Sequence, residues 1–90
     1  MPASSETLVV LPRDVDLHAR PAADFVRTAM RFDARVVVAA NGREADAKSL
    51  LTVLALGAKG GSELRLTADG DDAGPAVDAL ADCVVGLRES

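Results

Sequence analysis

Aromatic residues are nearly absent from this chain of 90 residues, since it has Phe25 and Phe32 but neither Trp nor Tyr. Proteins that bind single-stranded nucleic acid without sequence preference stack the bases on aromatic side chains. The chain lacks such stacking platforms, and its net charge of −4 repels a phosphate backbone. We therefore expect no nucleic-acid partner, and a core built from Ala, Val and Leu.

Cysteine and histidine are equally scarce, with Cys83 and His18 as single examples. One cysteine cannot form a disulfide framework, and the pair cannot supply the three or four ligands of a zinc site. No basic segment precedes an apolar run as in a signal peptide, and the apolar run at residues 8–11 is too short to cross a membrane. We expect a cytoplasmic protein without metal, cofactor or membrane insertion.

The length and composition are those of one small folded unit. Hydrophobic residues make up 49% of the chain and charged residues 27%, which is an ordinary balance for a globular protein. Ninety residues are too few to build two cores. We expect one domain over residues 1–90, and a monomer.

The spacing of apolar residues predicts the secondary structure. Short β-branched or alternating apolar runs predict strands at residues 7–11, 35–40, 43–47 and 62–68. Helical spacing predicts helices at residues 19–31 and 50–56, and a third one that starts at Pro75. The resulting order, β-α-β-β-α-β-α, predicts an α+β open-faced two-layer sandwich, with a four-stranded antiparallel sheet and three helices on one face.

Three turn and cap signals support these boundaries. Asn41 and Gly42 form a dipeptide typical of a type I′ hairpin, because both central residues of that turn have positive φ. Ser49 is expected to be the N-cap of the second helix. Gly57 is expected to end the same helix.

His18 lies where the loop after the first strand meets the first helix. At this position the backbone NH groups of Ala19 and Arg20 have no acceptor within the helix, and the helix dipole favours an anion. The Arg20 guanidinium can bind phosphoryl oxygens, and Pro21 is tolerated in a first turn. A neutral imidazole beside an anion site is a nucleophile. The segment therefore predicts a phosphoryl carrier rather than a hydrolase.

Three segments resemble the histidine-containing phosphocarrier (HPr) family of the phosphoenolpyruvate-dependent phosphotransferase system. They are LHARPAA at residues 17–23, AKSLL at residues 47–51, and GG followed by LRL within residues 60–66. The resemblance covers about residues 7–87. It implies that His18 is phosphorylated on Nδ1 by phospho-enzyme I and passes the group to an A-type enzyme II component, with Arg20 as phosphate partner. It also implies a carrier that is not itself an enzyme.

The chain departs from the family pattern directly before the histidine. Family members usually have Asn-Gly before the Leu-His pair, whereas this chain has a longer acidic segment at residues 13–16. Asp16 stands in place of a glycine, which can adopt backbone angles that are costly for other residues. The charge of Asp16 also lies close to the phosphate. We expect this segment to affect loop geometry, transfer rate and choice of partner.

Ser49 has two interpretations. As an N-cap, it stabilises the helix by ~1 kcal/mol, which explains it fully. The sequence Lys48-Ser49-Leu50 also resembles the site that a regulatory serine kinase phosphorylates in some family members. A kinase and phosphatase acting on Ser49 are therefore possible partners.

An apolar patch with a basic border is expected next to His18. Residues of the second helix that cannot face the sheet form its centre, and an arginine stripe on the first helix forms its rim, a combination that suits an acidic partner. The predicted partner-binding residues are Ala23, Arg27, Met30, Leu50, Leu51 and Leu54. The alternative is that the second helix is fully buried.

Three other functions stay open from the sequence. A regulatory paralogue would report its phosphorylation state without feeding sugar uptake. A binding module would use His18 only as a helix cap. An enzyme with a phosphohistidine intermediate would need a second acid-base group, and the sequence offers no other His, Cys or Tyr near the site.

Overall fold

The computed structural model describes residues 3–87 of the chain. The elements are β1 (Ser4–Val10), α1 (Ala19–Ala29), β2 (Arg35–Ala40), β3 (Arg43–Asp46), α2 (Leu50–Leu56), β4 (Glu63–Asp69) and α3 (Ala73–Val85). This is the predicted order of strands and helices, and it confirms the β-α-β-β-α-β-α arrangement.

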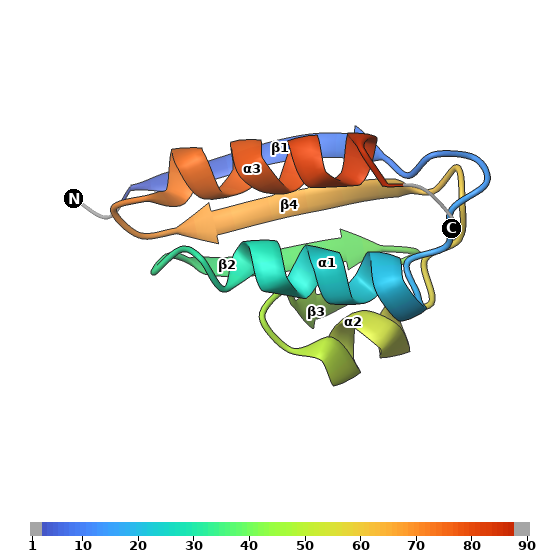
Figure 1. Ribbon diagram of the computed structural model, residues 1–90. Coiled ribbons are helices and arrows are strands. Elements are labelled where there is room, and N and C mark those ends of the chain that lie inside the picture. Colours follow the sequence, from blue (N-terminus) through green and yellow to red (C-terminus); the bar gives the residue numbers. More distant parts are fainter. Residues whose placement is uncertain (1–2, 88–90) are drawn as a thin grey trace.

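The four strands form one antiparallel sheet in the order β1-β4-β2-β3. The helices cover one face of this sheet, with α1 and α3 side by side across it (Figure 1). Strand residues that point towards the helices are buried, as Val9, Val38 and Leu66 show. On the opposite face, Leu8 and Val10 of β1 are more than half exposed. The expected open-faced sandwich is confirmed.

Three boundaries differ from the sequence prediction by two residues or more. β1 starts at Ser4, because β4 pairs with it along its whole length. Its first residues are polar, so the pattern of apolar residues in the sequence does not indicate this pairing. α1 ends at Ala29, since the amides of Arg31 and Phe32 donate to carbonyls three residues back and tighten the last turn. α3 starts at Ala73, before Pro75. The remaining boundaries agree within one residue.

The turn and cap predictions are confirmed. Asn41 and Gly42 have φ values of 56° and 75°, as a type I′ hairpin requires. The Ser49 hydroxyl accepts a hydrogen bond from the NH of Thr52 at 3.4 Å. Gly57 ends α2 in the left-handed region with φ 67°.

The core lies between the sheet and the helices and is mainly aliphatic. Phe25 is its fully buried aromatic residue. On the helices, the buried residues include Ala22, Phe25 and Ala29 of α1 and Val77, Leu80 and Val84 of α3. Val26 of α1 is half-buried. No polar or charged residue is buried within residues 3–87. The chemistry of the molecule must therefore take place at its surface.

Candidate functional site

His18 is the N-cap of α1, as the sequence predicts. Its backbone is extended, with φ −147° and ψ 163°, and its carbonyl accepts the first helical hydrogen bond from Ala22 NH at 3.3 Å. The imidazole is exposed. The amides of the first turn thus precede the helical hydrogen-bond ladder, at the end of the helix that attracts anions.

Ala19, directly after His18, has a left-handed backbone with φ 49°. This conformation costs a residue with a Cβ atom about 1 kcal/mol or more. Among the non-glycine residues of the part described, only Asn41 shares a positive φ. Asp16, which stands in place of the family's glycine, has no positive φ. Nothing in the identity of an alanine marks this position in the sequence.

The segment before His18 is hydrogen-bonded to the turn between α2 and β4. Leu17 NH donates to the Ala58 carbonyl at 2.9 Å, and Gly60 NH donates to Asp16 Oδ1 at 2.9 Å. A Cβ atom at Gly60 would overlap the carbonyl oxygen of Arg13, so only glycine allows this close approach. These two segments lie side by side at one end of the sheet (Figure 1).

A small hollow of about 210 Å³ lies beside the histidine. It is lined by residues from both segments and from α2: Asp16, Leu17, His18, Leu54, Gly57, Ala58 and Lys59. The hollow is open to solvent, and the imidazole that lines it is exposed.

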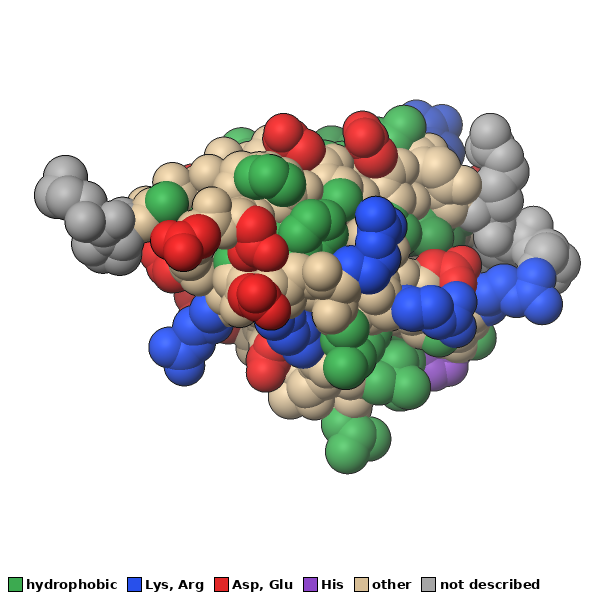
Figure 2. Space-filling view, turned by 60° about the vertical axis from the view of Figure 1, so that its left-hand side comes forward, with side chains coloured by type: hydrophobic (Ala, Val, Ile, Leu, Met, Phe, Trp, Pro, Cys, Tyr) green, Lys and Arg blue, Asp and Glu red, His purple; other side chains and the backbone are tan. Residues whose placement is uncertain are grey.

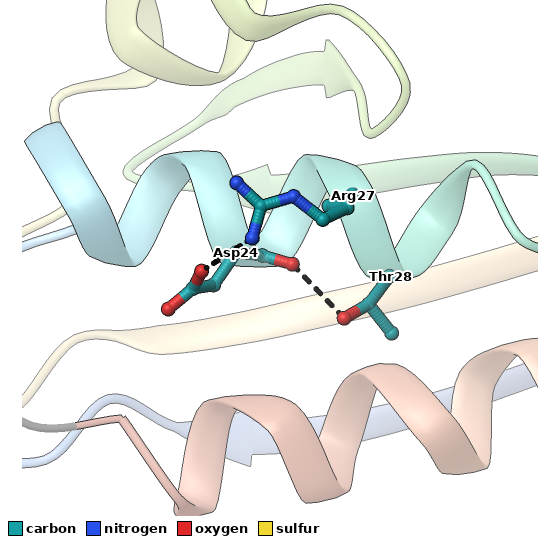
Figure 3. A network of polar contacts seen from close by, with 3 residues as sticks. All are labelled: Asp24, Arg27 and Thr28. Atoms are coloured by element: carbon teal, nitrogen blue, oxygen red, sulfur yellow. Dashed lines mark hydrogen bonds and ion pairs between the residues drawn. The ribbon is translucent and has the colours of Figure 1, made fainter.

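The predicted arginine stripe lies along α1 on its exposed side. Arg20, Arg27 and Arg31 line an open groove between α1 and α3 of about 720 Å³. Arg27 Nη1 lies 3.1 Å from Asp24 Oδ1 (Figure 3). Because the Arg27 side chain is 74% exposed, this ion pair contributes little to stability, and the guanidinium stays accessible to a partner.

The predicted apolar patch is present with one correction. Leu51 is 81% exposed, Met30 is 65% exposed and Leu50 is 42% exposed. Leu54 is half-buried, because it packs against the core and lines the hollow, so it was wrongly placed among the exposed residues. Ala23 is half-buried on α1. The alternative of a fully buried second helix is wrong.

Figure 2 shows the single histidine (purple) close to apolar side chains (green), with Lys and Arg side chains (blue) above them. An exposed apolar centre bordered by positive charge is typical of a docking surface for an acidic partner. The imidazole lies at the edge of this surface. A docked partner would therefore cover the imidazole.

Ser49 and Lys48 begin α2 at the far side of the patch. Ser49 is half-buried, and its carbonyl accepts from Val53 NH at 3.0 Å. Lys48 Nζ donates to the carbonyl of Phe32 at 2.6 Å and so joins the start of α2 to the end of α1. Sequence analysis did not identify this link, because the two residues are far apart in the chain.

Residues 3–87 contain neither a metal-binding cluster nor a membrane-spanning helix. No group of three or more His, Cys, Asp or Glu residues could hold a metal ion there. No helix in that range is long and apolar enough to cross a membrane.

Comparison with known proteins gives the family. The family model described as "PTS HPr component phosphorylation site" matches residues 5–85. The chain belongs to the HPr family. The phosphocarrier protein HPr of Haloferax volcanii is 46% identical over 78 residues, which are 84% of this chain and 86% of that relative. The expected family of phosphocarriers is thereby confirmed.

Solved HPr structures share the fold. The crystal structure of HPr from Bacillus anthracis matches with a TM-score of 0.86 at 36% identity, over 91% of this chain and 98% of that one. An HPr dimer from Thermoanaerobacter tengcongensis matches with a TM-score of 0.72 at 40% identity, over 77% and 79% of the two chains.

Proposed function

We propose that His18 accepts a phosphoryl group from phospho-enzyme I and passes it to A-type enzyme II components, for sugar uptake and phosphorylation. The observation that carries this proposal is the exposed imidazole at the N-cap of α1, open to a small hollow, in a member of a phosphocarrier family. In this role the protein is a co-substrate of phosphotransferases and not an enzyme.

The chemistry is a pair of reversible displacements. The Nδ1 lone pair of His18 attacks the phosphorus on the enzyme I histidine, so that one N–P bond forms as the other breaks and its electron pair returns to enzyme I. At enzyme II the imidazole of His18 is the leaving group. The first-turn amides of α1 (Ala19, Arg20) and the Arg20 guanidinium stabilise the phosphoryl oxygens by charge and position, which is most of what phosphoryl transfer requires.

The partner surface consists of the exposed apolar residues Met30, Leu50 and Leu51, with Arg27 at the border. Ala23 and Leu54 are half-buried next to it and add contact area. An acidic surface around the partner's reactive group would match this arrangement.

Ser49 is proposed as a regulatory site of a serine kinase and phosphatase. A phosphate there adds about two negative charges next to Leu50, and would repel the acidic partner that the surface otherwise attracts. Ser49→Asp should weaken binding of enzyme I, and unchanged binding would remove Ser49 from the account.

We further propose that the chain acts as one HPr-like domain over residues 1–90, in the cytoplasm and as a monomer. Light scattering after gel filtration should give the mass of one chain, and the mass of two chains would contradict it.

Reconstituted transfer tests the function. Enzyme I, phosphoenolpyruvate and an A-type enzyme II component are incubated with or without this protein, and phosphoryl groups on the enzyme II component are counted by intact mass. We expect transfer only when the protein is present, and none with His18→Ala. Transfer that is equal with wild type and His18→Ala would contradict the proposal.

A further inference from the structure

Asp16 occupies an unusual place for an acidic residue in a protein that receives phosphoryl groups. It lines the hollow beside His18 and is two residues from the imidazole. A fixed negative charge here repels an arriving phosphoryl group. The negative charge of the Asp16 carboxylate is thus unfavourable to the proposed phosphoryl transfer. Any contribution of this side chain to transfer must come from another of its properties.

The hydrogen bonds of Asp16 supply that property. Its side-chain Oδ1 accepts from Gly60 NH at 2.9 Å, and its backbone carbonyl accepts from His18 NH at 2.8 Å. One residue therefore binds both the turn that borders the hollow and the backbone of the histidine.

The contacts around this bond show what it holds in place. Leu17 NH is bonded to the Ala58 carbonyl, and the Gly60 backbone lies directly against the Arg13 carbonyl. The Asp16 side chain completes this junction from the exposed side of the loop, whereas the side chains of Val15 and Leu17 anchor the other side in the core. The hydrogen bond of Asp16 to Gly60 NH is thus the side-chain link that the exposed side of the loop makes to the turn.

We propose that Asp16 is a positioning residue for phosphoryl transfer, which holds the His18 segment against the turn at residues 58–61 through its hydrogen bond to Gly60. The proposal rests on the proposed function of His18. It assigns the effect to the acceptor oxygen of Asp16 and not to its charge. An uncharged side chain with the same oxygen should therefore serve equally well.

Two substitutions separate the acceptor from the charge. Asp16→Asn keeps an oxygen for Gly60 NH and removes the charge, whereas Asp16→Ala removes both. Asp14→Ala is the matched control, because it removes a charge from the same exposed loop. Each variant is assayed as a substrate of enzyme I with phosphoenolpyruvate, with kcat and KM measured separately. Amide hydrogen exchange at Gly60 is followed by NMR.

For Asp16→Ala we expect kcat to fall roughly tenfold, since small displacements of reacting groups have large effects on rate. Its KM should stay unchanged, because the docking surface is intact, and exchange at Gly60 should become faster. Asp16→Asn and Asp14→Ala should keep at least the wild-type kcat. All variants should unfold at similar temperatures.

Three results would overturn the inference. They are wild-type kcat in Asp16→Ala, an equal loss in Asp16→Asn and Asp16→Ala, and a change in KM alone. The first result would show that Asp16 has no role in transfer. The second would show that it acts through its charge, and the third that it contacts the partner. If wild type itself accepts no phosphoryl group, the proposed function fails and the inference with it, which is a distinct result.

Discussion

At the scale of single residues, the site depends on backbone conformation next to His18 as much as on side-chain chemistry. Ala19, the first residue of α1, has a left-handed φ of 49°. Strained residues of this kind persist where the surrounding structure holds them, and they cluster at functional sites. Buried Pro21 and the His18 segment on either side supply that restraint.

Ala19→Gly should stabilise the fold. Relief of the left-handed conformation outweighs the entropy cost of glycine, so the free energy of unfolding should rise by about 0.5–1 kcal/mol. Urea denaturation measures this change. Ala23→Gly, within the regular part of α1, should lower the free energy of unfolding by about 1 kcal/mol. Equal losses in both variants would show that Ala19 is not strained.

The reactivity of the Cys83 thiol reports its partial burial in the groove between α1 and α3. Burial of the thiol is the main cause that raises its pKa, and the nearby Asp24 carboxylate raises it further, although a hydrogen bond with Thr28 acts in the opposite direction. Because the thiolate is the reactive form, iodoacetamide at pH 8 should modify folded protein several-fold more slowly than urea-unfolded protein. Equal rates would contradict this description.

At the scale of elements, the loops opposite the His18 end are joined by Asp72 and Lys48. Asp72 is the N-cap residue of α3, but its carboxylate accepts from Asp33 NH at 2.9 Å and Ala34 NH at 2.7 Å. Lys48 binds the adjacent carbonyl of Phe32. The segment between α1 and β2 is therefore held from the start of α3 and from the start of α2.

The hydrogen bonds of the Asp72 carboxylate should make the stability of the protein depend on pH in the acidic range. The Asp33 NH hydrogen bond is the largest cause that lowers the pKa of Asp72 below its ordinary value of 3.8. Its stabilising effect is complete above that value and is lost as the pH falls through the lowered pKa, since the unfolded chain binds the proton first. Asp72→Asn should lower the unfolding temperature at pH 7 and flatten its decline in acid.

Asp71→Asn is the control for this experiment, because Asp71 is an exposed neighbour in the same loop. It should keep both the wild-type unfolding temperature and its dependence on pH. A decline in acid that is as steep in Asp72→Asn as in wild type would refute the role of Asp72.

The docking role of α2 can be separated from its role in the fold. Leu51 is exposed, so Leu51→Glu should change stability by no more than about 0.5 kcal/mol. It should raise the KM for enzyme I at least tenfold, because it puts a charge in the centre of an apolar interface. Val85→Glu is the matched control, as Val85 is 66% exposed on α3, and should leave KM unchanged.

At the scale of the whole molecule, the sequence predicts the elements better than the contacts between them. The hairpin at Asn41-Gly42, the cap at Ser49 and the end of α2 at Gly57 are local signals, and all three are confirmed. His18 was placed correctly at a helix start for the same reason, because capping is encoded within a few residues.

Long-range contacts were beyond this kind of prediction. The Asp16 hydrogen bond to Gly60 joins residues 44 positions apart, and the Asp72 bonds join loops 38 and 39 positions apart. Whether Leu54 is exposed depends on how α2 packs against the core, which helical spacing alone does not fix. The positive φ of Ala19 is likewise not indicated by any local signal in the sequence.

The central claim is that His18 itself takes up the phosphoryl group. The most direct test is to incubate the protein with enzyme I, magnesium and phosphoenolpyruvate, and to measure its intact mass beside that of His18→Ala. We predict one phosphoryl group on wild type, stable in base and lost in acid, and none on the variant. A wild type without the group, or an equal adduct on His18→Ala, would contradict the account.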